Sequence, residues 1–184
     1  MQWRSFFEKY LNYPLEVTIE TTGRCNARCT FCPHSELDRK NQMMSDELFE
    51  RILDQLTEIP PTHQFYISPF KVNEFLMDPQ IFRRIELINQ RLPNAYIRLF
   101  SNFNAAKTAD LERIVQIQNL SDIDISLNSL DEEEYRSLMG LDLSRTLSNI
   151  FEFLAYIRKN SIAMHKNKII FSRVAQNQEA DEQY

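Results

Sequence analysis

Three cysteines stand close together in a segment whose spacing suits a metal centre. Residues 21–39, TTGRCNARCTFCPHSELDR, hold every cysteine of the 184-residue chain, at Cys25, Cys29 and Cys32. Three thiols do not suit disulfides, which use cysteines in pairs, and a closed structural zinc site takes four ligands. Three thiolates on a four-iron cluster would leave one iron open, and an open position is typical of a catalytic centre. The spacing alone also admits a zinc site completed by His34, or three unligated thiols.

The bulk composition excludes several other functions. The net charge of −5 and the pI of about 5.3 give no basic field, so binding to bulk nucleic acid is not expected. The 21 Lys and Arg residues are scattered, and we expect them on solvated helix faces. We expect no membrane span and no signal peptide, and therefore a cytoplasmic, reducing location. With Gly23 and Gly140 as the only glycines, phosphate-binding loops of the Walker or dinucleotide type are absent.

Strand-like and helix-like segments alternate five times along the chain. Hydrophobic periodicity predicts strands at 15–22, 64–70, 95–103, 122–130 and 168–175. It predicts helices at 6–12, 44–59, 78–92, 107–120 and 144–160, followed by a polar tail at 176–184. This order is typical of a parallel sheet with right-handed crossovers. We therefore expect a single α/β domain over residues 1–184, built as a partial parallel (β/α) barrel.

Polar residues gather where the predicted strands end. The cysteine segment follows the first strand, Glu74 follows the second, and Ser101 and Asn102 lie at the end of the third. The fourth strand ends with the sequence SLNS. Because parallel strands end at one edge of their sheet, these residues are expected to lie together, and in such folds that edge carries the chemistry.

The cysteine segment resembles the signature of the radical S-adenosylmethionine (SAM) superfamily. CNARCTFC has its spacing, with Phe31 in the aromatic position before the last cysteine, and the flanking IETTGRCN and CPHS are also similar. The resemblance implies that Cys25, Cys29 and Cys32 ligate a [4Fe-4S] cluster whose open iron binds SAM. One electron from the cluster would then cleave SAM to methionine and a 5′-deoxyadenosyl radical, which abstracts hydrogen from a substrate.

Other segments extend the resemblance over most of the chain. SPFKVNEFLMDPQI stands where the family carries Gly-Gly-Glu-Pro, so that Glu74 matches the SAM-binding glutamate while Asn73 replaces a glycine. ISLNSLDEEEYRSLMG resembles members similar to the molybdenum-cofactor cyclase and to SPASM-type peptide-modifying enzymes. By this resemblance, the residues expected to seat SAM are Phe31, Asn73, Glu74, Ser101, Asn102, Ser126, Asn128 and Arg173.

The resemblance also sets expectations for partners and completeness. About five of the family's six strand–helix units are visible, so we expect a radical SAM core that stops before the sixth strand. It implies a one-electron donor of the flavodoxin or ferredoxin type. The substrate is unknown; peptide modification or cofactor biosynthesis follows by analogy. The alternatives are a structural metal-binding module and an inactive, truncated radical SAM fragment.

Overall fold

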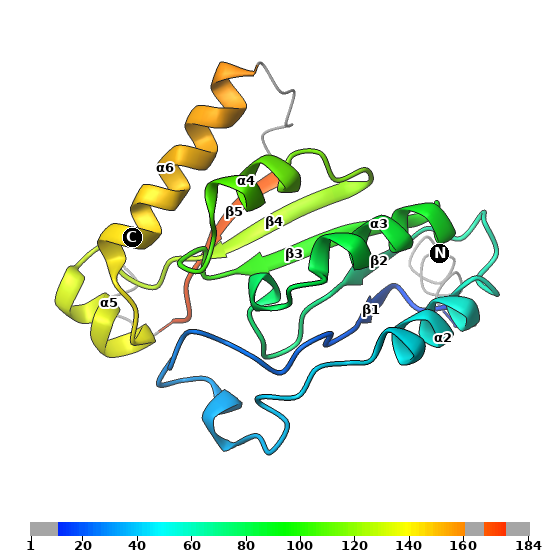
Figure 1. The fold of residues 1–184 in the computed structure, drawn as a ribbon, viewed down its shortest axis with the longest axis horizontal. Coiled ribbons are helices and arrows are strands. Elements are labelled where there is room, and N and C mark those ends of the chain that lie inside the picture. Colours follow the sequence, from blue (N-terminus) through cyan, green and yellow to red (C-terminus); the bar gives the residue numbers. More distant parts are fainter. Residues whose placement is uncertain (1–10, 161–167, 176–184) are drawn as a thin grey trace, which may run out of the picture.

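Five parallel strands form one sheet (Figure 1). The computed structural model describes residues 11–160 and 168–175. Each strand pairs with its neighbours in sequence, in the order β1 (Glu16–Thr18), β2 (Phe65–Ser68), β3 (Ala95–Ser101), β4 (Leu120–Ser126) and β5 (Ile169–Ser172). Among the described residues the sheet does not close, and β1 and β5 are its edges. The predicted order of strands and their parallel pairing are confirmed.

Five α-helices and two short 3-10 helices connect the strands within the described residues. They are η1 (Pro33–Glu36), α2 (Asp46–Leu56), η2 (Phe75–Met77), α3 (Ile81–Arg91), α4 (Thr108–Ile114), α5 (Glu132–Met139) and α6 (Leu143–Lys159). Side chains cap the N-termini of several helices: at α2, Ser45 accepts a hydrogen bond from Leu48 N, and at α6, Asp142 accepts one from Arg145 N. The helix predicted at 6–12 lies mainly, and the tail at 176–184 entirely, outside the described residues.

Two sequence-based boundaries around β4 are wrong. The helix predicted to reach residue 120 ends at Ile114, and β4 begins at Leu120, after a turn in which Asn119 adopts a φ of 54°. The strand predicted to reach residue 130 ends at Ser126, and the helix α5 that follows was not predicted. Its signals are present in the sequence, because Asp131 caps its first turn and Gly140, with a φ of 66°, ends it.

The two faces of the sheet differ in chemistry. Helices α2, α3, α4 and α6 bury apolar side chains against alternate strand residues such as Ile67, Leu99 and Ile123. On the opposite face, Arg98 donates hydrogen bonds to the carboxylates of Glu16 and Asp122. One face therefore makes the core, and the other carries a charged network across the start of β1, the middle of β3 and the first half of β4.

One buried cation contradicts the expectation that all basic residues are solvated. Arg84 of α3 is 2% exposed, and its guanidinium pairs with Asp78 at 3.0 Å and Asp46 at 3.1 Å. It also donates to the carbonyl oxygens of Thr21 and Met44, at 3.0 and 2.6 Å. All four contacts are made by the two terminal nitrogens, Nη1 and Nη2, while Nε has no hydrogen-bond partner among the described residues. Arg84 thus ties α3 to both ends of the segment that carries the cysteines.

No described helix has the length and apolar character needed to cross a membrane.

Candidate active site

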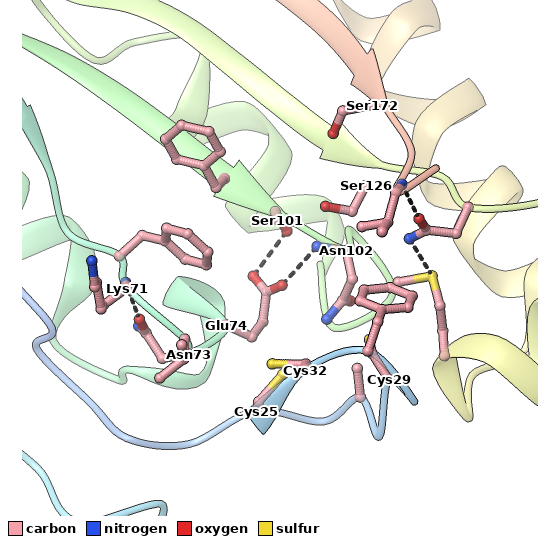
Figure 2. A pocket seen from close by; sticks show the side chains of 18 of the residues that line it. Cys25, Cys29, Cys32, Lys71, Asn73, Glu74, Ser101, Asn102, Ser126 and Ser172 are labelled. Atoms are coloured by element: carbon pink, nitrogen blue, oxygen red, sulfur yellow. Dashed lines mark hydrogen bonds between the residues drawn. The ribbon is translucent and has the colours of Figure 1, made fainter. Parts of the chain in front are cut away.

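All eleven residues predicted to form the site line one hollow at the carboxyl ends of the strands (Figure 2). The structure brings together Cys25, Cys29, Phe31, Cys32, Asn73, Glu74, Ser101, Asn102, Ser126, Asn128 and Arg173. In Figure 2, the cysteine segment lies on one side of the hollow, Glu74 lies between it and the end of β3, and Ser126 and Ser172 lie on the β4 and β5 side. The prediction that these residues share one edge of the sheet is confirmed by this placement; their roles in binding remain predictions.

The cysteine segment is held by backbone contacts to distant parts of the chain. Arg28 N donates to Met139 O at 2.8 Å and Thr30 N to Leu138 O at 2.9 Å, so the end of α5 supports the loop. Glu74 N donates to Arg24 O at 2.9 Å, which links the loop to the segment after β2. Gly23 is required by close packing, because a Cβ atom there would lie 2.1 Å from Arg39 O. The loop thus has a defined shape independent of its thiols.

The three thiols fit an iron–sulfur cluster better than a single metal ion. All three are free and half-buried, and burial raises the pKa of Cys25 to about 12 and that of Cys29 to about 11. Within the described residues, no three His, Cys, Asp or Glu side chains converge on one ion position. His34, the fourth ligand of the zinc alternative, instead has its Nε2 2.7 Å from Gly23 O. A cluster distributes its cysteine ligands over separate irons, and three free thiols that line one hollow provide such a set of ligands.

Glu74 is a buried carboxylate with spare capacity to accept a hydrogen bond. It is 2% exposed, and its Oε1 accepts from Ser101 Oγ at 2.8 Å and from Leu76 N at 3.3 Å. Its Oε2 accepts from Asn102 N at 2.8 Å, which leaves one of about four acceptor positions of the carboxylate unused. Burial raises the pKa of Glu74 to about 7, although these three donors act to lower it. A cationic group placed beside Oε2 would favour the ionised form.

Asn73 lines the same hollow and carries a side-chain donor without a partner among the described residues. The side chain is 4% exposed, and its Oδ1 accepts from Lys71 N at 2.9 Å, which fixes the orientation of the amide. Its Nδ2 is buried and has no hydrogen-bond partner in the part of the chain that the structure describes. A buried amide donor without a partner is costly, so a ligand acceptor in the hollow would satisfy it.

Three predicted site residues use their side chains to hold other groups. Ser101 Oγ donates to Glu74 and accepts from Phe103 N at 2.8 Å. Asn128 accepts from Val174 N at 2.8 Å and places its Nδ2 3.2 Å from the sulfur of Met139, so it joins the segments after β4 and β5. Asn102 donates from Nδ2 to Asn26 Oδ1 at 2.9 Å. These geometries are typical of positioning residues.

A set of three asparagines that the sequence did not reveal connects the cysteine loop to the barrel. We call Asn26, Asn102 and Asn104 the asparagine ladder. Asn102 donates to Asn26, and Asn26 Nδ2 donates to Asn104 Oδ1 at 3.2 Å. Asn104 Nδ2 in turn donates to Asp142 O at 2.9 Å and Thr146 Oγ1 at 3.1 Å, at the start of α6. The position of Asn26 between two cysteines was the available signal, but its partners lie 76 and 78 residues away.

Comparison with known proteins places the chain in a family. The family model described as Radical SAM superfamily matches residues 19–170. The probable GTP 3′,8-cyclase of Thermococcus kodakarensis is 28% identical over 143 residues, which are 76% of this chain and 43% of the relative. This chain therefore spans less than half the length of that curated relative.

Solved structures show the same fold. Streptococcus suis SuiB bound to its precursor peptide SuiA superposes with a TM-score of 0.68 and 20% identity, over 95% of this chain and 36% of SuiB. The protein anSMEcpe with bound S-adenosylmethionine gives a TM-score of 0.65 and 17% identity, over 85% of this chain and 42% of that chain. The predicted fold, a partial parallel (β/α) barrel of the radical SAM type, is confirmed, and the alternative of a structural metal-binding module is not favoured. By the extent of the family match, the chain belongs to the radical SAM superfamily, whose enzymes use a [4Fe-4S] cluster and SAM.

Proposed function

We propose that this chain is the catalytic core of a radical SAM enzyme. In this proposal Cys25, Cys29 and Cys32 hold a [4Fe-4S] cluster. When bound, the cluster supplies the electron that cleaves SAM to methionine and a 5′-deoxyadenosyl radical. The observation that carries the proposal is the placement of three free cysteines and a buried carboxylate, Glu74, on one hollow at the carboxyl ends of the strands.

Two neighbouring residues provide complementary groups for the amino-acid end of SAM. That end carries an ammonium and a carboxylate on one carbon atom. Glu74 offers an unused acceptor position for the ammonium, and Asn73 offers an unpaired Nδ2 donor for the carboxylate. Hydrogen bonds to charged groups are stronger than those between neutral groups, so both contacts favour the zwitterion. The departure from Gly-Gly-Glu-Pro is then compensated by the Asn73 side chain.

The remaining lining residues suit the rest of the ligand. The rings of Phe70 and Phe100 stack with centroids 5.1 Å apart, and Phe31 is 40% exposed at the hollow. These rings give an apolar wall that excludes water from a reactive radical. Ser126 and Arg173 line the opposite part, and in this proposal they contact the ribose or the carboxylate of SAM. In this proposal Ser101, Asn102 and Asn128 act by positioning.

The proposed partners are a reductant and an organic substrate. A one-electron donor of the flavodoxin or ferredoxin type is proposed, since enzymes of this superfamily need a reductant. The SuiB structure contains a precursor peptide, which supports a peptide as the first substrate class to test here. The GTP 3′,8-cyclase relative makes a nucleotide the natural comparison substrate. A cytoplasmic location and a single domain over residues 1–184 complete the proposal.

The test is anaerobic reconstitution with iron and sulfide, followed by metal analysis and an assay for 5′-deoxyadenosine. We expect about four irons and four sulfides per chain, and 5′-deoxyadenosine after adding SAM and dithionite. Cys29→Ala should lose the cluster and the product. The control is Ser35→Ala, which alters an exposed residue of η1 and keeps all three thiols. Tightly bound zinc in place of iron, or an unchanged cluster in Cys29→Ala, would contradict the proposal.

A further inference from the structure

The cysteine loop separates two hollows. Cys25, Cys29 and Cys32 line the hollow that contains Glu74, and the same three residues also line a second hollow. The rest of its lining comes from residues 24–41 and from Met77, and we call it the outer hollow. Figure 1 shows this part of the chain, in blue, at the border of the molecule and outside the layer of helices. A cluster bound by the three thiols would therefore be approached from two sides.

The outer hollow is basic in a chain that is acidic overall. Arg24, Arg28 and Lys40 line it and are exposed, and Glu36 is the one carboxylate among its lining residues. None of the three cations has an ion-pair partner within the described residues, and Lys40 Nζ donates to a backbone carbonyl, Ser35 O, at 3.0 Å. The net charge of the chain is −5. The charge at the outer hollow is thus opposite in sign to the net charge of the chain.

Neighbouring charges do not cancel this field. Arg39 is neutralised by Glu20, with a separation of 2.7 Å, and neither residue lines the outer hollow. Asp38 is exposed in the same segment but does not line the hollow. Three unpaired cations against one carboxylate at the wall of a concave surface attract an anionic partner and orient its approach.

We propose that this basic outer hollow is the docking surface for a small acidic one-electron donor protein. The inference rests on the proposed function, since it needs a cluster held by the three cysteines. The inner hollow is occupied by SAM and substrate during turnover, so the outer one offers the remaining short path to the same thiolates. One electron leaves the reduced donor, which becomes one-electron oxidised, and enters the oxidised cluster; no bond forms or breaks.

A small acidic electron donor would be recognised mainly through its charge. Electron-transfer complexes are weak and bury little surface, so a small patch is sufficient. Electrostatic complementarity raises association rates, and screening by salt removes the gain. The basic residues of the outer hollow should therefore control the rate of electron transfer to the cluster and leave the cluster itself unchanged.

The experiment measures the reduction rate of the reconstituted protein by reduced flavodoxin, an acidic one-electron donor, in an anaerobic stopped-flow instrument. The variant is Arg24→Glu with Arg28→Glu. The matched control is Arg51→Glu with Lys159→Glu, two exposed basic residues on α2 and α6 that do not line the hollow. At low salt we expect the variant to be reduced about tenfold more slowly or worse, and the control to match the wild type, whose rate should fall as salt rises.

Reduction by dithionite distinguishes a damaged cluster from a lost docking surface. Dithionite is a small reductant that needs no protein docking, so equal reduction of both variants shows an intact cluster. If the Arg24→Glu, Arg28→Glu protein accepts electrons from flavodoxin at the wild-type rate, the docking surface is wrong while the proposed function stands. A wild-type rate that does not depend on salt would overturn the docking surface in the same way. If no protein assembles a cluster, the proposed function fails and this inference fails with it.

Discussion

Glu74→Gln should change how the stability of the cluster-free protein depends on pH. Burial raises the pKa of Glu74 from its ordinary 4.5 to about 7, so the folded protein binds this proton more tightly than the unfolded chain. The sign follows from linkage: the free energy of unfolding falls as pH rises from about 4.5 to 7, because ionisation is easier in the unfolded chain. Glutamine at this position cannot ionise and removes the effect.

The size of the effect follows from the shift. At 1.36 kcal/mol for each pKa unit, Glu74 contributes a loss of about 2 to 3 kcal/mol between pH 5 and pH 8. The assay is urea denaturation of the cluster-free wild type and Glu74→Gln at both pH values, under reducing conditions. The fall in unfolding free energy should be smaller in the variant by that amount. Glu133→Gln, which removes an exposed carboxylate of α5, is the control. Identical pH slopes in wild type and Glu74→Gln would refute the description of a buried, desolvated carboxylate.

Three further substitutions test other parts of the site. Asn26→Ala removes both side-chain hydrogen bonds that Asn26 makes in the asparagine ladder. The variant should lower the free energy of unfolding by about 1 to 3 kcal/mol in urea denaturation, and it should lose more iron during gel filtration. Full iron retention would contradict a role of Asn26 in holding the loop. Asn73→Ala should weaken SAM binding by about tenfold or more in equilibrium dialysis, because a hydrogen bond to a charged group is lost, and unchanged affinity would remove Asn73 from the site. Arg84→Leu leaves the buried carboxylate of Asp78 without its cation and should cost about 3 to 5 kcal/mol in the same denaturation assay; a loss below about 1 kcal/mol would contradict the buried pair.

Local patterns allowed the site to be located from the sequence. The spacing of Cys25, Cys29 and Cys32 is a local signal, and strand–helix alternation placed Glu74 and Ser126 at the same edge because parallel strands share one direction. Both kinds of inference use neighbouring residues or a simple topological rule. The eleven predicted residues consequently line one hollow.

Features that depend on distant partners were not predictable in this way. The roles of Ser101 and Asn128 as positioning residues depend on the groups that fold against them, and the sequence shows only a serine and an asparagine near turns. Arg84 resembles any other helix arginine until Asp78 and two carbonyl oxygens surround it. The error at residues 115–120 has a similar origin, since apolar residues such as Ile117 pack on the core from a turn and mimic helical periodicity.

Electron paramagnetic resonance of the reconstituted, reduced protein, with and without SAM, tests whether the three cysteines hold a cluster that SAM contacts. We expect the signal of a reduced cubane cluster held by Cys25, Cys29 and Cys32, and we expect this signal to change when SAM is added. A cubane signal that is indifferent to SAM would contradict the role given to Asn73 and Glu74. A protein that takes up zinc and shows no cluster signal would contradict the assignment of a [4Fe-4S] cluster to these cysteines.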